Sequence, residues 1–346
     1  MRIRLENLDI KSLEEFFKDL GEGPYRARQL FRWFYQARVS SFGPMTDLSK
    51  GLREKLTRIS GFSRYAPVTE RISSDGTRKY LFRFDDGRMV ESVLIFHEGR
   101  TTACLSSQVG CQLGCVFCRT ASLGFTRNLT PGEIVGQFLG MEEKSGQKIT
   151  NAVFMGMGEP FLNYDNVRKA VRILASHYGI ALPLRKITIS TAGLVPQIKR
   201  FVKDNQAEGS WPNLAVSLNA VTNQLRDTLM PINRKYPLEQ LLEALHCFPG
   251  QRRKTIMFEY ILFDRLNDGE GDALKLAAMA KGISRRLNLI PYHADPRGSL
   301  RQSPEKKIDR FRAILARQHR LTPIIRESRG ADIEAACGQL RAEYQP

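Results

Sequence analysis

The sequence predicts an α/β protein in which parallel strands alternate with covering helices, preceded by a small helical unit and a β-hairpin. Apolar residues recur at helical spacing over residues 1–62, which predicts a helical accessory domain. Over 63–99 the pattern changes to a period of two, which predicts a hairpin linker. From 100 to 346 strand-like and helix-like runs alternate, and about six βα units fit either a partial barrel or an open doubly wound sheet.

The N-terminal unit is expected to contain three helices. Residues 13–17 and 28–34 carry apolar side chains at helical spacing, and the glycine- and proline-containing stretch 21–24 separates them. Residues 48–59 give a third helical run. Arginines on the outer face of such a unit suit RNA binding, and a plain cap over the core explains the same pattern equally well.

The hairpin is predicted by a turn between two alternating runs. Residues 79–84 and 89–95 are rich in aromatic and β-branched side chains, and the turn between them contains Asp86-Gly87. An Asp-Gly pair readily adopts the positive backbone φ that a tight hairpin turn needs.

The larger part opens with a helix whose start is marked in the sequence. Thr130, Pro131 and Glu133 supply an N-cap, a first-turn proline and a capping-box carboxylate, which predicts a helix over 131–144. Further strands are expected at 151–155, 186–191, 213–218, 255–262, 287–291 and 323–326, with helices near 163–176, 237–246, 272–281 and 304–318. Because helices join consecutive strands, the sheet is expected to be parallel.

The charge balance favours a polyanionic partner. The 346 residues include 53 Lys and Arg against 36 Asp and Glu, a formal net charge of +17. Such an excess suits RNA, although a basic protein can also need charge for solubility alone. The cations are spread over the chain and include Arg26, Arg252, Arg253, Lys254, Arg285 and Lys307. No apolar run is long enough to span a membrane and no apolar leader follows Met1, so we expect a cytoplasmic protein.

The strongest chemical signal is a triplet of cysteines. Cys111, Cys115 and Cys118 follow the pattern C-x-x-x-C-x-x-C on one short stretch. Three thiolates there can hold three irons of a four-iron cluster and leave the fourth iron open to a small molecule. The alternative is a zinc loop that takes Cys104 as its fourth ligand, but the spacing matches the usual paired C-x-x-C of zinc sites poorly. We therefore interpret the triplet as an iron–sulfur site.

These cysteines belong to a longer set of motifs. The set comprises Y-R-A-R-Q-L at 25–30, C-L-S-S-Q-V-G-C at 104–111, the triplet with Phe117 before its last member, G-F-T-R-N-L at 124–129, G-M-G-E-P at 156–160 and R-G-A-D-I-E-A-A-C-G-Q-L at 329–340. Together the motifs resemble the RlmN/Cfr family of radical S-adenosylmethionine RNA methyltransferases, and most closely its RlmN branch. The resemblance covers almost the whole chain and implies a partial (β/α)6 radical-SAM barrel.

The resemblance implies two cofactors, a [4Fe-4S] cluster and S-adenosylmethionine. Cys111, Cys115 and Cys118 would ligate the cluster, whose free iron chelates S-adenosylmethionine and cleaves it to a 5′-deoxyadenosyl radical. The residues implied to contact S-adenosylmethionine are Gly158, Glu159, Ser190, Ser217, Leu218, Asn219 and His293. Read alone, glycines after a strand indicate only a tight turn, and a serine at a strand end is more often a helix cap. Two positions depart from the family: it usually has histidine where this chain has Asn219, and asparagine where this chain has His293.

The resemblance also implies a methyl carrier. Cys337 accepts a methyl group, a radical removes hydrogen from that methyl, and the resulting carbon radical adds to an adenine carbon. Cys104 then takes a proton and forms a transient disulfide with Cys337, while Glu91 acts as a base or hydrogen-bonding group at the adenine. Considered without the resemblance, a lone cysteine is most often an inert buried residue, and this packing role is assigned to Cys247. A glutamate on a half-exposed strand, such as Glu91, is usually solvated.

The function implied by the resemblance is methylation of adenosine C2 in 23S rRNA and, in many members, of the adenosine that follows the tRNA anticodon. Methylation of C8 is the nearest alternative. A non-catalytic zinc RNA-binding module and a radical enzyme acting on a peptide are the other classes considered. We also expect an electron donor such as flavodoxin or ferredoxin. We expect the protein to be a monomer and to have no membrane partner.

Overall fold

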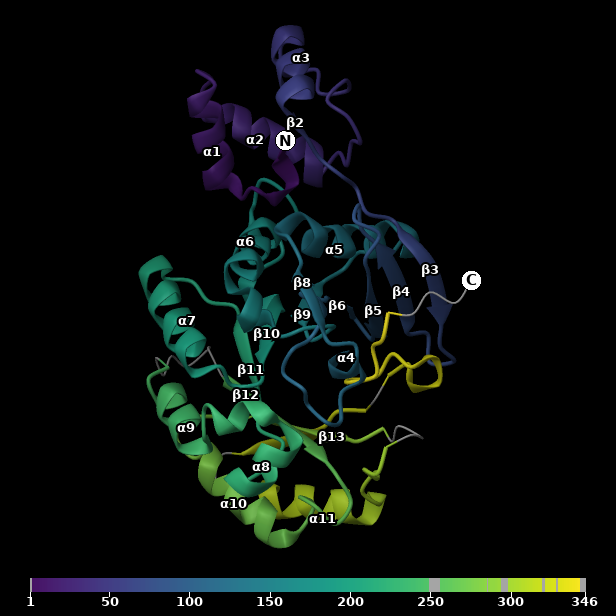
Figure 1. Ribbon diagram of the computed structural model, residues 1–346, viewed down its shortest axis with the longest axis vertical. Coiled ribbons are helices and arrows are strands. Elements are labelled where there is room, and N and C mark those ends of the chain that lie inside the picture. Colours follow the sequence, from purple (N-terminus) through teal and green to yellow (C-terminus); the bar gives the residue numbers. More distant parts are fainter. Residues whose placement is uncertain are drawn as a thin grey trace.

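The computed structural model describes residues 2–248, 256–284, 286–293, 298–318, 321–327 and 329–342. The basic residues Arg252, Arg253, Lys254 and Arg285, and the first residue of the strand expected at 255–262, lie outside these ranges. Figure 1 shows the N-terminal helices at one end of the molecule, a large sheet at its centre and the remaining helices along the outer side of that sheet.

The three expected N-terminal helices are present as α1 (Ile10–Asp19), α2 (Tyr25–Tyr35) and α3 (Lys50–Ile59). The start of α1 is fixed by Asp9, whose carboxylate accepts a hydrogen bond from the Ser12 backbone N–H at 3.0 Å. Two short strands, β1 (Ile3–Arg4) and β2 (Ser60–Gly61), pair in parallel. This pairing brings both ends of the helical unit to the point where it joins the rest of the chain.

The described strands of the larger part form one open ten-stranded sheet, in the order β14-β13-β12-β11-β10-β9-β6-β5-β4-β3. Its antiparallel edge consists of β3 (Pro67–Ile72), β4 (Arg78–Arg83) and β5 (Met89–His97). Its parallel part consists of β6 (Arg100–Cys104), β9 (Asn151–Phe154), β10 (Ile187–Thr191), β11 (Asn213–Ser217), β12 (Ile256–Leu262), β13 (Arg286–Pro291) and β14 (Thr322–Ile325). The predicted hairpin is therefore continuous with the parallel sheet through the pairing of β5 with β6.

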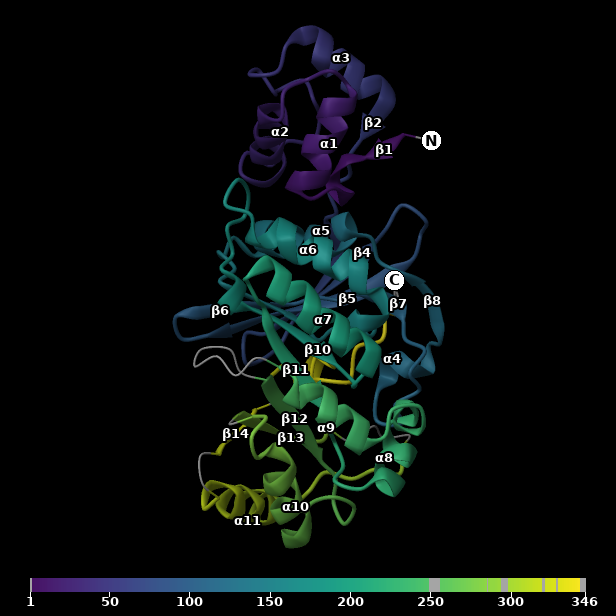
Figure 2. The ribbon, with the colours of Figure 1, turned by 90° about the vertical axis from the view of Figure 1, so that its left-hand side faces the viewer.

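Helices cover the outer side of this curved sheet (Figure 2). They are α5 (Pro131–Ser145), α6 (Tyr164–Ala175), α7 (Val195–Glu208), α9 (Leu238–His246), α10 (Glu270–Ala280) and α11 (Glu305–Ala316). The capping box predicted at Thr130 and Glu133 opens α5. Two short helices, α4 (Arg119–Ser122) and α8 (Asn223–Leu229), and an antiparallel pair, β7 (Gln108–Gly110) and β8 (Phe125–Asn128), lie beside the sheet. The structure confirms the α/β partial barrel, while β6 to β8, α4, α7 and α8 were not predicted.

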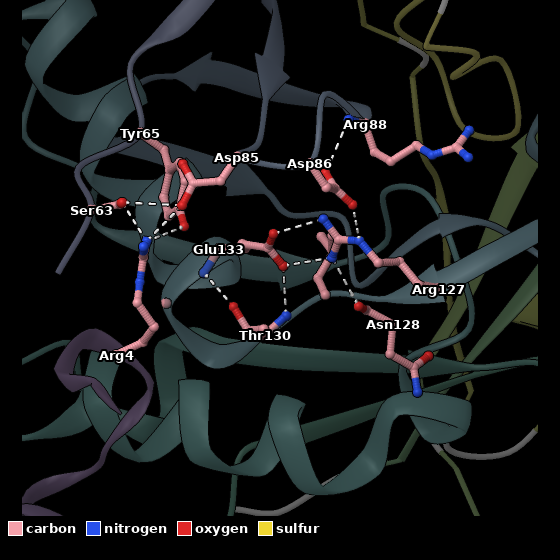
Figure 3. Close-up of polar contacts among 12 residues, drawn as sticks. Arg4, Ser63, Tyr65, Asp85, Asp86, Arg88, Arg127, Asn128, Thr130 and Glu133 are labelled. Carbon is pink, nitrogen blue, oxygen red and sulfur yellow. Dashed lines mark hydrogen bonds and ion pairs between the residues drawn. The ribbon is translucent and has the colours of Figure 1, made fainter. Parts of the chain in front are cut away.

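Two arginines connect the hairpin turn to its neighbours (Figure 3). Arg4, at the end of β1, lies 2.8 Å from the Asp85 carboxylate in that turn. Arg127 of β8 donates to Asp86 in the same turn at 2.6 Å and to both carboxylate oxygens of Glu133 at 2.8 and 2.9 Å. The turn is thereby held between the N-terminal unit and α5.

Among the described residues, no helix combines the length and the hydropathy that crossing a bilayer requires. The cytoplasmic location, the monomeric state and the domain limits at 62 and 99 stay predictions.

Candidate active site

A cavity of about 160 Å³ lies at the carboxyl ends of the parallel strands, the edge at which barrel proteins place their sites. The cysteine triplet, Cys111, Cys115 and Cys118, lines it together with the distant Cys337. Most of the predicted cofactor-binding residues also line it, namely Gly158, Glu159, Ser190, Ser217 and Asn219. The structure thus brings the cysteine triplet, the C-terminal cysteine and the strand-end residues to one cavity.

The cysteine triplet lies on a loop that main-chain hydrogen bonds hold in shape. The Cys111 N–H donates to the Gly124 carbonyl at 2.8 Å, and the Cys118 N–H donates to the Cys115 carbonyl at 3.1 Å. Gly110 has φ +76°, and a Cβ there would lie 1.9 Å from the Gly124 oxygen, so only glycine allows this approach. Burial raises the pKa of all three thiols, that of Cys111 to about 12. The thiols stay protonated at neutral pH until a metal displaces their protons.

The thiols of the triplet fit a cluster better than zinc. A tetrahedral zinc needs all its sulfurs about 2.3 Å from one point, whereas each cysteine of a four-iron cluster binds a different iron. Cys104, the fourth ligand of the zinc alternative, interacts electrostatically with Cys337 instead of with the triplet. The predicted ligands Cys111, Cys115 and Cys118 therefore fit the cluster.

Gly158 and Glu159 form one wall of the cavity after β9. Gly158 has φ +96°, and a Cβ there would lie 2.5 Å from the Gln108 side chain, so the backbone conformation and the close approach both require glycine. The Glu159 carboxylate accepts hydrogen bonds from the Phe161 N–H at 3.0 Å and the Ala192 N–H at 2.8 Å. Burial raises the pKa of Glu159 to about 7. A buried carboxylate fixed in this way can receive a ligand's ammonium group.

The remaining predicted cofactor residues divide into two groups. Ser190, Ser217 and Asn219 line the cavity, whereas Leu218 is fully buried and, like His293, is not among the lining residues. The Asn219 amide is already engaged, because its oxygen accepts from the Ile261 N–H at 3.0 Å and its nitrogen contacts the Met230 sulfur at 3.3 Å. At the position where the family usually has histidine, this asparagine joins β11 to β12.

Cys337 is exposed and lines the cavity from a C-terminal segment, residues 329–342, which we call the Cys337 segment. This segment packs directly on α4, the helix that follows the cluster loop. The Arg119 N–H donates to the Gly338 carbonyl at 2.8 Å, and the Thr120 hydroxyl donates to the Leu340 carbonyl at 2.7 Å. No local pattern predicted these contacts, which place Cys337 beside the cluster loop.

Cys104 and Cys337 are both free thiols, and the described residues contain no disulfide. The transient disulfide expected between them belongs to a step of the reaction and stays a prediction. Cys104 is buried at the end of β6, and burial followed by the nearby Cys337 raises its pKa to about 12. Cys247 was assigned to packing, but it is exposed just after α9 and contributes nothing to the core.

Glu91 is buried rather than solvated. One carboxylate oxygen lies 3.0 Å from the Lys79 ammonium, and the other accepts a hydrogen bond from the Arg341 N–H at 2.8 Å. Lys79 also donates to the Glu334 carbonyl at 3.3 Å. The Lys79–Glu91 ion pair therefore contacts the segment on both sides of Cys337, at Glu334 and at Arg341. Glu91 is not among the residues that line the cavity, and its role at the substrate stays a prediction.

Three charged residues at the site were missed by sequence reasoning. Arg226 is fully buried, interacts electrostatically with Cys115, and donates to the carbonyls of Leu218 at 3.0 Å and Ala192 at 2.6 Å. Glu259 and Arg326 line the cavity with their charged atoms 3.7 Å apart. Glu259 interrupts the apolar run of β12, and this pattern could have marked it as a candidate site residue. Arg226 lies in a polar stretch, where a charged residue is ordinary and does not indicate a site.

Two comparisons with protein families agree with this site. Residues 3–61 match the family described as the ribosomal RNA large subunit methyltransferase N-terminal domain, and residues 105–277 match the radical SAM superfamily. The dual-specificity RNA methyltransferase RlmN of Geobacter sulfurreducens is 48% identical over 341 residues, which cover 99% of this chain and 92% of that protein. The chain belongs to the RlmN family. The RlmN of Syntrophotalea carbinolica is 45% identical and covers 99% of this chain and 90% of that protein.

A solved structure supports the same assignment. A radical SAM methyltransferase from Sphaerobacter thermophilus matches with a TM-score of 0.89 and 42% identity, covering 99% of this chain and 100% of that one. The protein is accordingly a radical SAM methyltransferase that uses a [4Fe-4S] cluster and S-adenosylmethionine, as expected for an RlmN-family member.

Proposed function

We propose that the protein methylates C2 of an adenosine in 23S rRNA, and of the adenosine that follows the tRNA anticodon, through a methyl group carried on Cys337. The observation that carries this proposal is that Cys337 lines the same cavity as the cluster cysteines and Glu159. A carrier thiol is useful only within reach of both the methyl donor and the radical source. The relatives' description as dual-specificity RNA methyltransferases supports a role on two RNA classes.

The chain's own residues would hold the cofactors against this thiol. The cluster and S-adenosylmethionine supply a methyl group and a hydrogen-abstracting radical, which unactivated adenine carbons require. The thiols of the triplet hold the cluster, and Glu159 holds the ammonium end of S-adenosylmethionine beside it. Ser190 and Ser217, at the ends of adjacent strands β10 and β11, offer hydroxyls to the rest of the molecule. The whole site lies in a pocket that a base can enter only when it leaves its stack.

Cys104 and Glu91 are proposed to complete the reaction. Cys104 is the second thiol near Cys337 and would, as a thiolate, take the proton from the adenine carbon that carries the Cys337-bound CH2 group. Its sulfur would then attack the Cys337 sulfur, so that an S–S bond forms as the S–CH2 bond breaks, and the proton passes to the released carbon to complete the methyl group. A thiol reductant would reopen this transient disulfide. Glu91 would orient the Cys337 segment through the Arg341 N–H and act on the adenine when the segment moves.

The N-terminal helices are proposed to grip the RNA. They expose cations on their outer faces, among them Arg28, Arg32, Lys50 and Arg58. Phosphate neutralisation by such residues supplies affinity without reading sequence. The whole chain, with its net charge of +17, supports the same partner.

The decisive experiment is a nucleoside digest. Anaerobically reconstituted protein is incubated with 23S rRNA or tRNA, S-adenosylmethionine and a reductant, and the digested RNA is analysed by mass spectrometry against both methyladenosine standards. We expect 2-methyladenosine. Formation of 8-methyladenosine would overturn the C2 assignment, and a colourless protein that binds RNA without modifying it would favour the zinc-module alternative.

A further inference from the structure

Residues 105–108, between Cys104 and the cluster loop, have no part in the reaction proposed above. We call them the linking segment. All of them are buried, although Ser106, Ser107 and Gln108 are polar. Because burying a polar group costs free energy unless the group is hydrogen-bonded, the partners of these residues indicate what the segment does.

The main chain of Ser106 is held by a side chain from α5. Gln137 of α5 is fully buried; its amide oxygen accepts the Ser106 N–H at 2.9 Å, and its amide nitrogen donates to the Ser106 carbonyl at 3.1 Å. The same oxygen accepts the Ser92 hydroxyl of β5 at 2.6 Å, and the nitrogen also donates to the Glu133 carbonyl at 3.1 Å. Both lone pairs and both N–H groups of this amide are used, so the position of Ser106 is tightly defined.

The Ser106 hydroxyl connects two strands that carry different parts of the site. It donates to the Glu91 carbonyl of β5 at 2.5 Å and accepts a hydrogen bond from the Met157 N–H, just beyond β9, at 2.8 Å. The Glu91 N–H donates to the Met157 sulfur at 3.2 Å. Strands β5, β6 and β9 are neighbours in the sheet, as Figure 1 shows. One hydroxyl therefore joins the main chain of Glu91 to the turn that contains Gly158 and Glu159.

The other polar residues of the linking segment contact the same turn. The Ser107 N–H donates to the Met157 carbonyl at 2.8 Å, and the Gln108 side-chain oxygen accepts the Glu159 N–H at 2.8 Å. The Ser107 hydroxyl is buried, has no hydrogen-bond partner among the described residues and is not part of the cavity lining. Of the two adjacent serine hydroxyls, only that of Ser106 therefore connects β5 to the turn.

We propose that Ser106, held by Gln137, is a positioning residue that keeps the substrate side of the site in register with the cofactor side. The inference rests on the proposed function, in which Glu91 and the Cys337 segment serve the adenine and Glu159 holds S-adenosylmethionine. Ser106 is fully buried and is not among the residues that line the cavity, so it acts through the main chain of its neighbours. No bond is made or broken at its hydroxyl.

The register matters because the radical and its target are held from opposite sides. S-adenosylmethionine, the source of the radical, is held by Glu159, whereas the methyl group to be attacked is on Cys337, whose segment is held by Glu91 through the Arg341 N–H. Reacting groups must meet within about 3–3.5 Å, and a misplacement of about 1 Å can cost roughly 100-fold in rate. When the two sides lose register, the radical takes hydrogen from a buffer molecule and leaves as 5′-deoxyadenosine, without methylation.

The test compares radical formation with methylation. Holoprotein carrying Ser106→Ala or Gln137→Met is incubated anaerobically with S-adenosylmethionine, a reductant and RNA, and 5′-deoxyadenosine and methyladenosine are quantified in the same sample. Ser107→Ala is the adjacent control, since it removes a hydroxyl that has no partner among the described residues. Ser284→Ala is the stability control. Its buried hydroxyl donates to the Ile256 carbonyl at 2.6 Å, at the amino ends of the strands and therefore away from the cavity.

A second measurement uses cluster-free protein and needs no turnover. Amide hydrogen exchange is followed in peptides that contain residues 153–159. In Ser106→Ala the Met157 N–H loses its acceptor, so we expect its exchange to be faster by about tenfold or more. Ser107→Ala should leave this exchange at the wild-type rate.

We expect Ser106→Ala and Gln137→Met to keep the iron content and the rate of 5′-deoxyadenosine formation, and to raise the ratio of 5′-deoxyadenosine to methyladenosine by about tenfold. Ser107→Ala and Ser284→Ala should keep the wild-type ratio. An unchanged ratio in Ser106→Ala and Gln137→Met would overturn the proposal. So would an equal loss of both products, because the contacts would then serve only to stabilise the fold. Wild-type protein that forms 5′-deoxyadenosine but no methyladenosine would instead contradict the proposed function.

Discussion

The two cysteine-bearing segments that meet at the cavity are held in different ways. Main-chain hydrogen bonds fix the cluster loop, such as those from Cys111 to Gly124 and from Val116 to Leu229. The Cys337 segment is held largely by side chains from other elements. Asp75 accepts from the Gly330 N–H, Lys79 and Glu91 hold Glu334 and Arg341, and Thr120 donates to Leu340.

This difference matches the two tasks. A cluster needs ligands that stay in place, and main-chain bonds within one loop provide them. The methyl carrier proposed above would present its sulfur first to a methyl donor and then to a base, and separate side-chain anchors can release one at a time. Gly330 and Gly338, with φ +67° and +81°, lie at the two ends of the stretch that contains Cys337. We therefore expect the cluster loop to be the fixed half of the site and the Cys337 segment to be the movable half.

Removing a ligand from the fixed half should have the largest effect. Cys115→Ala leaves two thiols of the triplet, and we expect the iron content to fall from about four per chain to near zero, because the cluster needs all three protein ligands. Iron and sulfide analysis with a visible spectrum checks this. Retention of a full cluster in Cys115→Ala would show that the ligand assignment is wrong.

Removing Cys337 should abolish methylation without affecting the cluster. Cys337→Ala is expected to keep its cluster, since Cys337 is not a ligand, and to lose methylation by on the order of 1,000-fold or more, since the nucleophile is gone. Methyl incorporation into RNA and iron content are measured on the same sample. Cys247→Ala, an exposed cysteine away from the site, is the control and should retain full activity. Undiminished methylation by Cys337→Ala would end the carrier proposal.

Removing the second thiol should trap the movable half on its substrate. With Cys104→Ala the proposed separation of Cys337 from the product cannot occur, so we expect a covalent protein–RNA adduct that accumulates to about one per chain. Denaturing gel electrophoresis with labelled RNA detects it, and Cys104→Ala with Cys337→Ala provides the control without a carrier. Free, fully methylated RNA from Cys104→Ala would exclude this role.

Loosening an anchor should affect the movable half alone. Lys79→Met removes one partner of a buried ion pair, which typically costs about 3–5 kcal/mol, and we expect faster amide hydrogen exchange in residues 330–341 with little change in the cluster loop. Adding Glu91→Gln should recover part of the loss, because the carboxylate is then no longer unpaired. Arg200→Met, which breaks a mainly exposed pair with Asp165, should cost less than about 1 kcal/mol.

The smallest effect should be a pH dependence in the fixed half. Burial raises the pKa of Glu159 from 4.5 to about 7, so the folded chain holds this proton more tightly than the unfolded chain. The resulting stability is complete below pH 4.5 and is lost as the pH rises through 7, by about 3 kcal/mol. Denaturant unfolding of cluster-free protein across pH 5–8 should show this slope, and Glu159→Gln should remove the Glu159 contribution while leaving that of other buried carboxyls with raised pKa, such as Glu91 and Glu259. An identical slope in the variant would contradict the assignment.

Local patterns predicted the elements well, and the tertiary arrangement less completely. The strand expected at 213–218 is observed at Asn213–Ser217, and the capping box of α5 is where its residues placed it. Helix α7 was missed although Val195, Ile198 and Phe201 are buried at helical spacing, because its many charged residues obscured the apolar stripe. That the hairpin extends the main sheet could not be predicted, since strand pairing between distant segments leaves no local signal.

The same limit applies to the site. Motif spacing identified the triplet, whereas Cys337 and Glu159 were assigned through the family that their motifs resemble. Lys79 and Arg226 were missed because a lone cation in a sequence is ordinarily solvated, and only the fold shows that these two are buried. Their partners come from other parts of the chain or are main-chain carbonyls, which a sequence does not reveal.

Because of the buried guanidinium of Arg226, we expect cluster binding to increase the stability of the fold. Its pKa is lowered by burial to about 10, and its hydrogen bonds go to carbonyls and to the Asn233 amide. Because burial lowers this pKa even though the nearby Asp227 raises it, the cation is incompletely offset in the cluster-free protein. The negative charge of thiolates bound to iron, with Cys115 the nearest of them, would offset that cation. Exposure to air should therefore lower the melting temperature as well as bleach the colour.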